Sequence, residues 1–132
     1  MKTILEPSKN IPVIDDTDIC VLGGSCTGVF AAVRAARLGA KVVIIEKQNC
    51  FGGVATSGLV NVWHSMYDTE HKKRIIAGLT GEVIDRLKIR NAVIDNENDA
   101  EKSKSIANVF NSEELKIELD ILIREGKIKP YL

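Results

Sequence analysis

The sequence predicts an α/β fold built on a parallel sheet, and three consecutive segments support this prediction. Residues 19–22 form a short, continuously apolar run, which is typical of a strand buried on both faces of a parallel sheet. Residues 28–38 place four alanines on one helical face, so a helix there can pack close to a sheet. Residues 41–46, KVVIIE, are typical of a second buried strand. This order predicts a right-handed crossover between parallel strands, as in a Rossmann-like βαβ unit.

The later segments extend this unit without completing it. Residues 48–60 are rich in glycine and small residues and show no period, which predicts a loop. Residues 80–89 and 111–125 carry apolar stripes at helical spacing, whereas the polar residues 95–105 predict a surface loop or insertion. Residues 127–132 are typical of the opening of a third strand. The predicted parallel sheet is therefore incomplete.

Specific residues are expected to begin and end the helices. Gly39 and Gly126 follow the two clearest helical segments, where a glycine commonly ends a helix in the left-handed conformation. Asn111 is expected to cap the helix that follows it. Glu114 lies three residues further on, and the two form a capping-box-like pair.

Length and charge limit the domain organisation and the partners. The 132 residues suffice for one domain, and we assign residues 1–17 to an N-terminal arm and residues 18–132 to the domain. The 18 basic and 18 acidic side chains give a formal net charge of zero. This balance predicts neither a nucleic-acid partner nor attraction to an anionic membrane surface.

The cysteines and the N-terminus predict a cellular location. Cys20, Cys26 and Cys50 are odd in number and show no C-x-x-C spacing, so we expect free thiols in a reducing compartment. Cys20 lies in a predicted strand and is expected to be buried. The N-terminus lacks the apolar core of a secretory signal, and no apolar run is long enough to span a membrane. The expected location is the cytoplasm.

A glycine turn lies between the first strand and the first helix. Residues 23–28, GGSCTG, occupy the G-x-G-x-x-G pattern, with Ser25 in place of the second glycine. The first glycine permits the tight turn, the last permits close helix–strand packing, and the N–H groups at the helix N-terminus face an anion. Glu46 follows Gly23 by 23 residues, where an acid accepts hydrogen bonds from ribose hydroxyls. The pattern predicts dinucleotide binding; an α/β domain with a glycine turn and no phosphate ligand is the alternative.

A second glycine segment, GGVATSG at residues 52–58, extends the pattern. With the turn VLGGSCTG, the helix VFAAVRAARLGA and the acid Glu46, it resembles the FAD-dependent oxidoreductases of the glutathione-reductase type. More narrowly, the chain is similar to relatives of the heterodisulfide reductase A subunit. The resemblance covers residues 12–90 clearly and residues 110–132 more loosely.

The resemblance implies FAD as the cofactor and assigns residues to it. The turn would bind the pyrophosphate, Glu46 the adenosine ribose with Lys47 beside it, and the second glycine segment would pass close to the ribityl and flavin end. The residues expected to bind the cofactor are Gly23, Gly24, Ser25, Cys26, Thr27, Gly28, Glu46, Lys47, Gly52, Gly53, Thr56 and Ser57.

Two further residues near these segments have two interpretations each. Cys26 lies at a helix N-terminus, where a thiolate is favoured, but its small size also makes room for a phosphate, which is the interpretation we prefer. His64 follows the second glycine segment. It could donate a proton near the flavin, or it could be a structural histidine, which we prefer because no partner acid or base is identifiable.

The resemblance also excludes some chemistry and leaves alternatives open. The chain lacks the C-x-x-x-x-C pair that related disulfide reductases place after the second glycine segment. Some relatives hold a 4Fe-4S cluster, but three scattered cysteines cannot supply its four ligands. Relatives are several hundred residues long, so we expect an N-terminal fragment of a flavoenzyme, a truncated reading frame or one half of a split protein. A small-molecule or protein redox partner is expected, and self-association or a complementing chain is possible.

Two other functions remain as alternatives. The chain could be a non-catalytic nucleotide-binding or interaction fragment that needs a partner polypeptide. It could also be an NAD-binding module, although such a module has no reason to carry the second glycine pair. No catalytic residue is identified.

Overall fold

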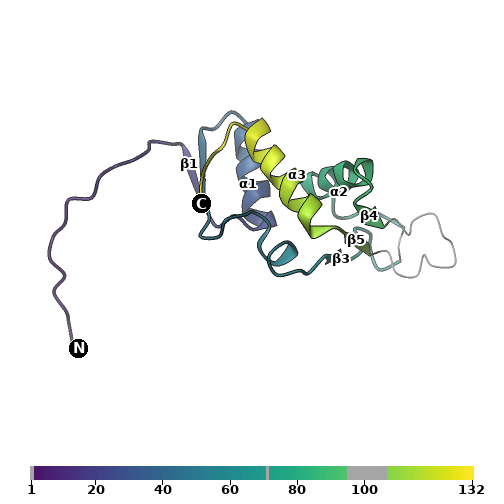
Figure 1. Cartoon of the computed structure of the whole chain (residues 1–132), viewed down its shortest axis with the longest axis horizontal. Helices are drawn as coiled ribbons and strands as arrows, with labels where there is room; N and C mark the ends of the chain where they lie inside the picture. The colour runs from purple at the N-terminus through teal and green to yellow at the C-terminus, as the bar shows by residue number, and fades with distance from the viewer. Residues whose placement is uncertain (1, 71, 95–106) are drawn as a thin grey trace.

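The computed structural model describes residues 2–70, 72–94 and 107–132 and confirms the α/β fold (Figure 1). A three-stranded parallel sheet has the order β1 (Ile19–Leu22), β2 (Val42–Ile45) and β6 (Lys129–Tyr131). The strand β6 is the third strand that the sequence predicts. The predicted loop at residues 95–105 lies outside the described residues.

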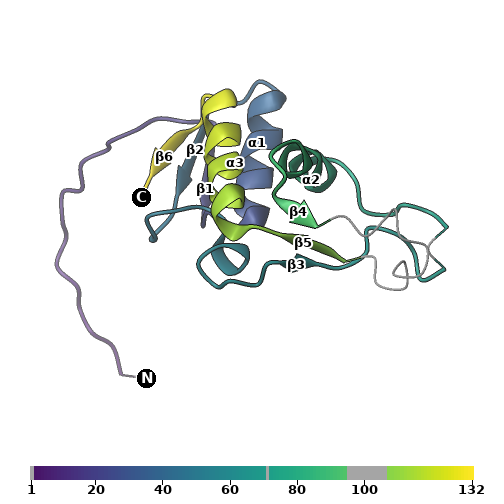
Figure 2. The same ribbon diagram turned by 45° about the vertical axis from the view of Figure 1, so that its right-hand side comes forward.

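Two helices cover one face of this sheet. Figure 2 shows α1 (Cys26–Arg37) and α3 (Ser112–Glu125) side by side against the strands. Val29 and Val33 of α1, Ile44 of β2 and Leu119 of α3 are almost completely buried and belong to one core. The helix α1 begins two residues earlier than predicted because Ser25 is its N-cap, and Gly39 follows its end with a φ of 95°, as expected.

A second, antiparallel sheet was not predicted from the sequence. It has the order β3 (Val62–Trp63), β5 (Asn108–Phe110) and β4 (Val93–Ile94). The helix α2 (Leu79–Ile89) packs against α3 and precedes β4. Strands of two or three residues are too short to show an alternating pattern, which explains why the sequence did not reveal them.

The capping predictions for α3 are right only in part. The side chain of Asn111 accepts hydrogen bonds from the N–H groups of Glu113 and Glu114, as an N-cap does. The capping-box prediction is wrong, because the Glu114 carboxylate bonds to Arg90 and the Asn111 N–H donates to the carbonyl of Ala92. Gly126 ends the helix with a φ of −74°, so it is not left-handed.

The prediction that β1 is buried on both faces is also wrong. Cys20 is exposed, and Leu22 keeps 79% of its surface accessible. The strand lies at the sheet edge, and the face opposite α1 and α3 carries no helix of the described chain. Val13 and Ile14 of the arm reach this open face, where a cavity of about 460 Å³ also touches Ile45.

Residues 2–17 contain no helix or strand and are largely exposed. The inner end of this segment is held at Asp15, which accepts a hydrogen bond from the Tyr131 hydroxyl at 3.0 Å and pairs with Lys129 at 2.8 Å. Within the described residues, no helix is long and apolar enough to cross a membrane.

Candidate functional site

The turn from β1 into α1 depends on glycine at two positions. Gly23 has a φ of 100°, which favours glycine, and its N–H donates to the carbonyl of Ile45 at 2.8 Å. A Cβ at Gly28 would overlap the backbone carbonyl of Gly23, so this glycine brings the helix against the turn. A Cβ at Gly23 would meet no atom within 4 Å, so its surroundings are open.

The N-terminus of α1 presents an electropositive surface. Ser25 caps the helix, and its Oγ accepts a hydrogen bond from the N–H of Gly28 at 3.4 Å. The first turn holds no acidic residue, so no carboxylate there repels an anion. Gly23, Ser25 and Thr27 are exposed, and the helix end is therefore accessible to a phosphate group.

The structure brings the two glycine segments into direct contact. The N–H of Gly52 donates to the carbonyl of Gly24 at 2.8 Å, and Ser25 and Gly52 form an isolated parallel bridge. The thiol of Cys26 lies 3.6 Å from the carbonyl of Gly52. Gly52 has a φ of 107°, and a Cβ on Gly53 would lie 3.3 Å from that of Ser25. The two segments are thus one continuous backbone surface.

Glu46 lies at the end of β2 and is bound to the turn. Its carboxylate accepts hydrogen bonds from the N–H of Gly24 at 2.6 Å and of Gln48 at 2.9 Å. These two bonds, the Gly24 bond most, lower the pKa of Glu46 below its usual value, so the group is ionised at neutral pH. An ionised carboxylate has about four acceptor sites, which leaves capacity for ligand hydroxyls. Lys47 is exposed next to it.

Several predicted cofactor residues point into the protein. Thr56 is fully buried, and its hydroxyl donates to the carbonyl of Phe51 at 2.7 Å. A Cβ on Gly24 would overlap the Phe51 ring, so this glycine makes room for the aromatic side chain. Ser57 is exposed, with its Oγ 3.3 Å from the Sγ of Cys50. Gly24 and Thr56 therefore stabilise the backbone of the site through their contacts with Phe51 and do not face a ligand.

The environment of Cys26 favours a neutral thiol. Burial raises the pKa of Cys26 to about 11, despite its position in the first turn of α1. Desolvation penalises the charged thiolate, and this effect outweighs the backbone hydrogen bond of Cys26, which lowers the pKa. This environment argues against a reactive thiolate at Cys26.

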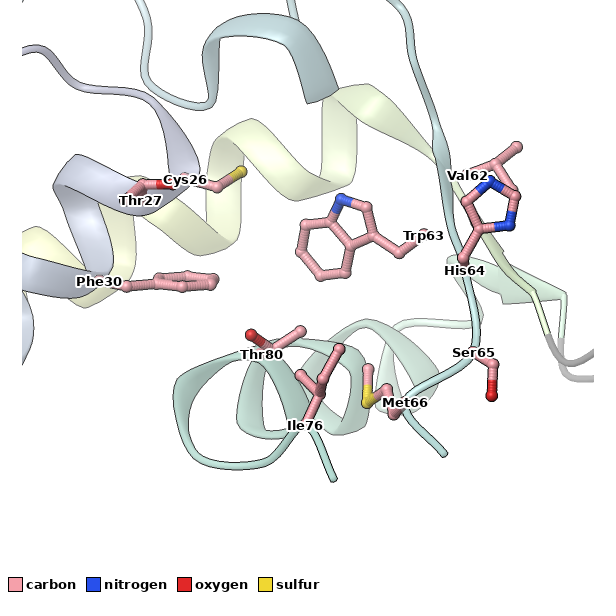
Figure 3. A pocket seen from close by; sticks show the side chains of 10 residues that line it. All are labelled: Cys26, Thr27, Phe30, Val62, Trp63, His64, Ser65, Met66, Ile76 and Thr80. Atoms are coloured by element: carbon pink, nitrogen blue, oxygen red, sulfur yellow. The ribbon is translucent and has the colours of Figure 1, made fainter. Parts of the chain in front are cut away.

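The sequence did not reveal a cavity of about 430 Å³ beside the turn (Figure 3). Its lining includes Cys26, Phe30, Trp63, Met66, Ile76 and Thr80. These side chains come from α1, β3, the segment after β3 and α2, so no local spacing could show that they meet. His64, which directly follows β3, also lines this cavity, together with Ser65.

A family model described as "FAD dependent oxidoreductase" matches residues 18–132. The chain belongs to the FAD-dependent oxidoreductase family. The narrower relationship to the heterodisulfide reductase A subunit is not shown by this match. FAD is the cofactor of the family, and the open turn, the exposed N-terminus of α1 and the ionised Glu46 fit a dinucleotide of this kind.

Two curated relatives of this family member each match less than half of the chain. The dihydrolipoyl dehydrogenase of Staphylococcus aureus is 36% identical over 67 residues, which are 46% of this chain and 14% of that protein. The mitochondrial dihydrolipoyl dehydrogenase 2 of Arabidopsis thaliana is 33% identical over 64 residues, 43% of this chain and 13% of that protein. The aligned segments thus span only a small part of either relative.

Two solved structures share the fold of this family member. The THI4 protein of Thermovibrio ammonificans has a TM-score of 0.55 at 19% identity, covering 87% of this chain and 38% of that protein. A geranylgeranyl bacteriochlorophyll reductase-like protein of Thermoplasma acidophilum has a TM-score of 0.52 at 18% identity, covering 87% and 29%. At such identities the similarity concerns the fold alone.

Proposed function

We propose that this chain holds the ADP half of FAD in an FAD-dependent oxidoreductase. The contact between the two glycine segments carries this proposal, because the Gly52 N–H bonds directly to the Gly24 carbonyl at 2.8 Å. Backbone from both segments and from the α1 N-terminus therefore faces one place. In this proposal, residues 18–132 belong to the FAD-binding domain and residues 1–17 form its N-terminal arm.

The predicted cofactor residues take different roles in this proposal. Backbone groups of Gly23, Ser25 and Thr27 bind the pyrophosphate, since all three are exposed at the helix end. Glu46 accepts hydrogen bonds from the ribose hydroxyls. Lys47 lies beside the ribose position, and Gly53 and Ser57 lie towards the flavin end. The other predicted residues fix the backbone conformation of the site: Gly24, Cys26, Gly28, Gly52 and Thr56.

The bound FAD supplies electron or hydride transfer with an organic substrate or a redox partner protein. This chain contributes binding and orientation, and we assign no general acid or base. Dithiol–disulfide exchange is not proposed, because the sequence has no cysteine after the second glycine segment. We place the chain near the heterodisulfide reductase A subunit on its glycine and alanine motifs.

We propose no iron–sulfur cluster in this chain, and we propose a reducing compartment. The three cysteines are free, and the described residues contain no group of His, Cys, Asp or Glu side chains that could hold a metal ion. Free thiols support a reducing compartment, and we propose the cytoplasm.

A second candidate is a non-catalytic fragment completed by another polypeptide or by self-association. The open face of the parallel sheet favours this candidate. Leu22 is 79% exposed and Ile45 is 41% exposed on that face, and apolar sheet surfaces of this kind promote association. An NAD-binding module is the third candidate. Substitution of Gly52 would not test the NAD-binding candidate. The Gly52 N–H bonds to the Gly24 carbonyl within the chain itself, so the substitution would disturb the turn for either dinucleotide.

The first experiment is a visible spectrum of the purified chain, followed by FAD titration after stripping. A flavin band released on denaturation would support the FAD proposal for this chain alone. ADP binding without flavin binding would support a half-site that requires a complementing chain. Binding of NADH but not of FAD would contradict the proposal and favour the third candidate.

A further inference from the structure

The cavity of about 430 Å³ shares a wall with the proposed cofactor site. Cys26 and Thr27 line it from the first turn of α1, and the Cys26 thiol also lies 3.6 Å from the carbonyl of Gly52. One residue of the glycine turn therefore separates the cavity from the second glycine segment. A ligand in this cavity would lie next to the proposed cofactor site.

Trp63 forms the inner wall of the cavity and is fixed by the second sheet. The strand β3 pairs Trp63 with Asn108 of β5, and the indole ring lies 4.8 Å from the ring of Phe110, centroid to centroid. Phe110 is buried in the core. Figure 3 shows Trp63 pointing towards Cys26, with Phe30 approaching from α1. The position of the Trp63 ring is thus fixed by its packing on Phe110 and by the pairing of β3 with β5.

The opposite wall is held by backbone hydrogen bonds and by Arg74. The N–H groups of Ile75 and Ile76 both donate to the carbonyl of Met66, at 2.9 and 3.0 Å. The Arg74 guanidinium donates to the Ile76 carbonyl at 3.1 Å and lies 3.3 Å from the Met66 sulfur. Gly81 makes room for this guanidinium, because a Cβ there would overlap it. Met66 and Ile76 are therefore positioned together.

The chemistry of the lining selects the ligand class. Most of the lining is aromatic, aliphatic or sulfur-containing. The polar groups of the lining are the hydroxyls of Thr27, Ser65 and Thr80, the thiol of Cys26 and the imidazole of His64. Among the described residues that line the cavity, none carries a carboxylate, an ammonium or a guanidinium group, so a charged ligand would lose hydration without an ion-pair partner in the lining. The volume lies in the usual range for small-molecule sites, about 300–1,000 Å³.

We propose that this cavity binds an uncharged, ring-bearing part of the organic substrate. The inference rests on the proposed function, because it identifies the occupant with the molecule that exchanges electrons with FAD. Aromatic stacking on Trp63 and Phe30 contributes affinity, and the Thr80 hydroxyl offers one hydrogen bond to a ring substituent.

The test uses the flavin-free full chain and the emission of Trp63, its one tryptophan. Cyclohexanol is the uncharged ring probe, and cyclohexanecarboxylate is its charged counterpart. We expect a saturable shift of the emission with cyclohexanol and at least tenfold weaker binding of the carboxylate. The absence of a saturable shift, or equal affinity for both probes, would overturn the proposal.

A matched pair of variants locates the probe. Ile76→Asp places a carboxylate in the cavity, whereas Ile45→Asp places one on the open sheet face; the two isoleucines are 45% and 41% exposed. We expect Ile76→Asp to weaken cyclohexanol binding at least tenfold and Ile45→Asp to leave it unchanged. The reverse result would assign the probe to the sheet face and overturn the proposal.

A third variant does not depend on how well Ile76→Asp folds. Gly81→Ala adds a helix-favouring residue to α2 but displaces the Arg74 guanidinium, so it should weaken cyclohexanol binding several-fold without lowering the melting temperature. Unchanged cyclohexanol affinity in Gly81→Ala would contradict the role of Arg74 in positioning Met66 and Ile76.

ADP titration of the unmodified chain separates the two proposals. If the chain does not bind ADP, the proposed cofactor site is contradicted. If it binds ADP but not cyclohexanol, only the proposed ligand of the cavity is contradicted.

Discussion

The backbone N–H of Gly24 donates a 2.6 Å hydrogen bond to the carboxylate of Glu46, 22 residues further along the chain. This bond connects the turn after β1 to the end of β2. It fixes the acid beside the glycine turn before any ligand binds. The same carboxylate thus has a structural partner and, in our proposal, a ligand partner.

Glu46→Ala should weaken the binding of ADP by roughly 1–3 kcal/mol, because buried ligand hydroxyls lose a charged acceptor. Isothermal titration calorimetry with ADP measures this loss. Glu6→Ala is the control, since it removes the same charge from the exposed arm. Equal ADP affinity in the Glu46→Ala protein and the unmodified chain would remove Glu46 from the site.

Gly23→Ala and Gly39→Ala form a pair that separates backbone strain from ligand binding. Their φ values are 100° and 95°, and in both cases the added Cβ meets no atom within 4 Å. Each substitution should therefore lower the free energy of unfolding by about 1–2 kcal/mol. Only Gly23→Ala should also weaken ADP binding, because only Gly23 lies in the turn. Denaturant unfolding and calorimetry measure the two effects; similar ADP affinities for both variants would argue against the proposed pyrophosphate site.

Thr56→Val should destabilise the second glycine segment by about 1–3 kcal/mol, because the buried carbonyl of Phe51 loses its donor at 2.7 Å. Thr56→Ser keeps the hydroxyl and should retain the hydrogen bond. Urea unfolding of both proteins compares the two changes. If Thr56→Val matched Thr56→Ser in stability, the hydroxyl would have no structural role.

The sequence predicts the parts of this molecule that depend on local pattern. The strand–turn–helix–strand unit ending at Glu46 is confirmed because apolar runs, glycines and alanine spacing are all encoded within about 30 neighbouring residues. The exposure of Leu22 was not predictable, since it depends on what covers the distant face of the sheet. The meeting of Trp63 with Cys26 and Ile76 was likewise unpredictable, because it depends on the tertiary arrangement of separate elements.

An ion-pair network that the sequence did not reveal connects the three helices. Glu82 of α2 accepts hydrogen bonds from Arg37 of α1 at 2.6 and 2.7 Å and from Arg86 at 2.8 Å. Arg86 also donates to Glu125 of α3 at 2.7 and 2.9 Å. The Arg37 bond is the main reason that the pKa of Glu82 falls to about 2.

This lowered pKa predicts how stability depends on pH. Because the folded-state pKa of Glu82 lies below its ordinary value of 4.5, its contribution is fully present above about pH 5 and is lost as the pH falls towards 2. Glu82→Gln should cost roughly 1 kcal/mol at neutral pH, a modest value because these pairs are partly exposed. The variant should also lose less stability than the unmodified chain between pH 5 and pH 2. Thermal unfolding across this range measures both effects, with Glu70→Gln, at another ion pair, as the control. Parallel pH profiles for Glu82→Gln and the unmodified chain would show that Glu82 does not contribute to the acid sensitivity of the fold.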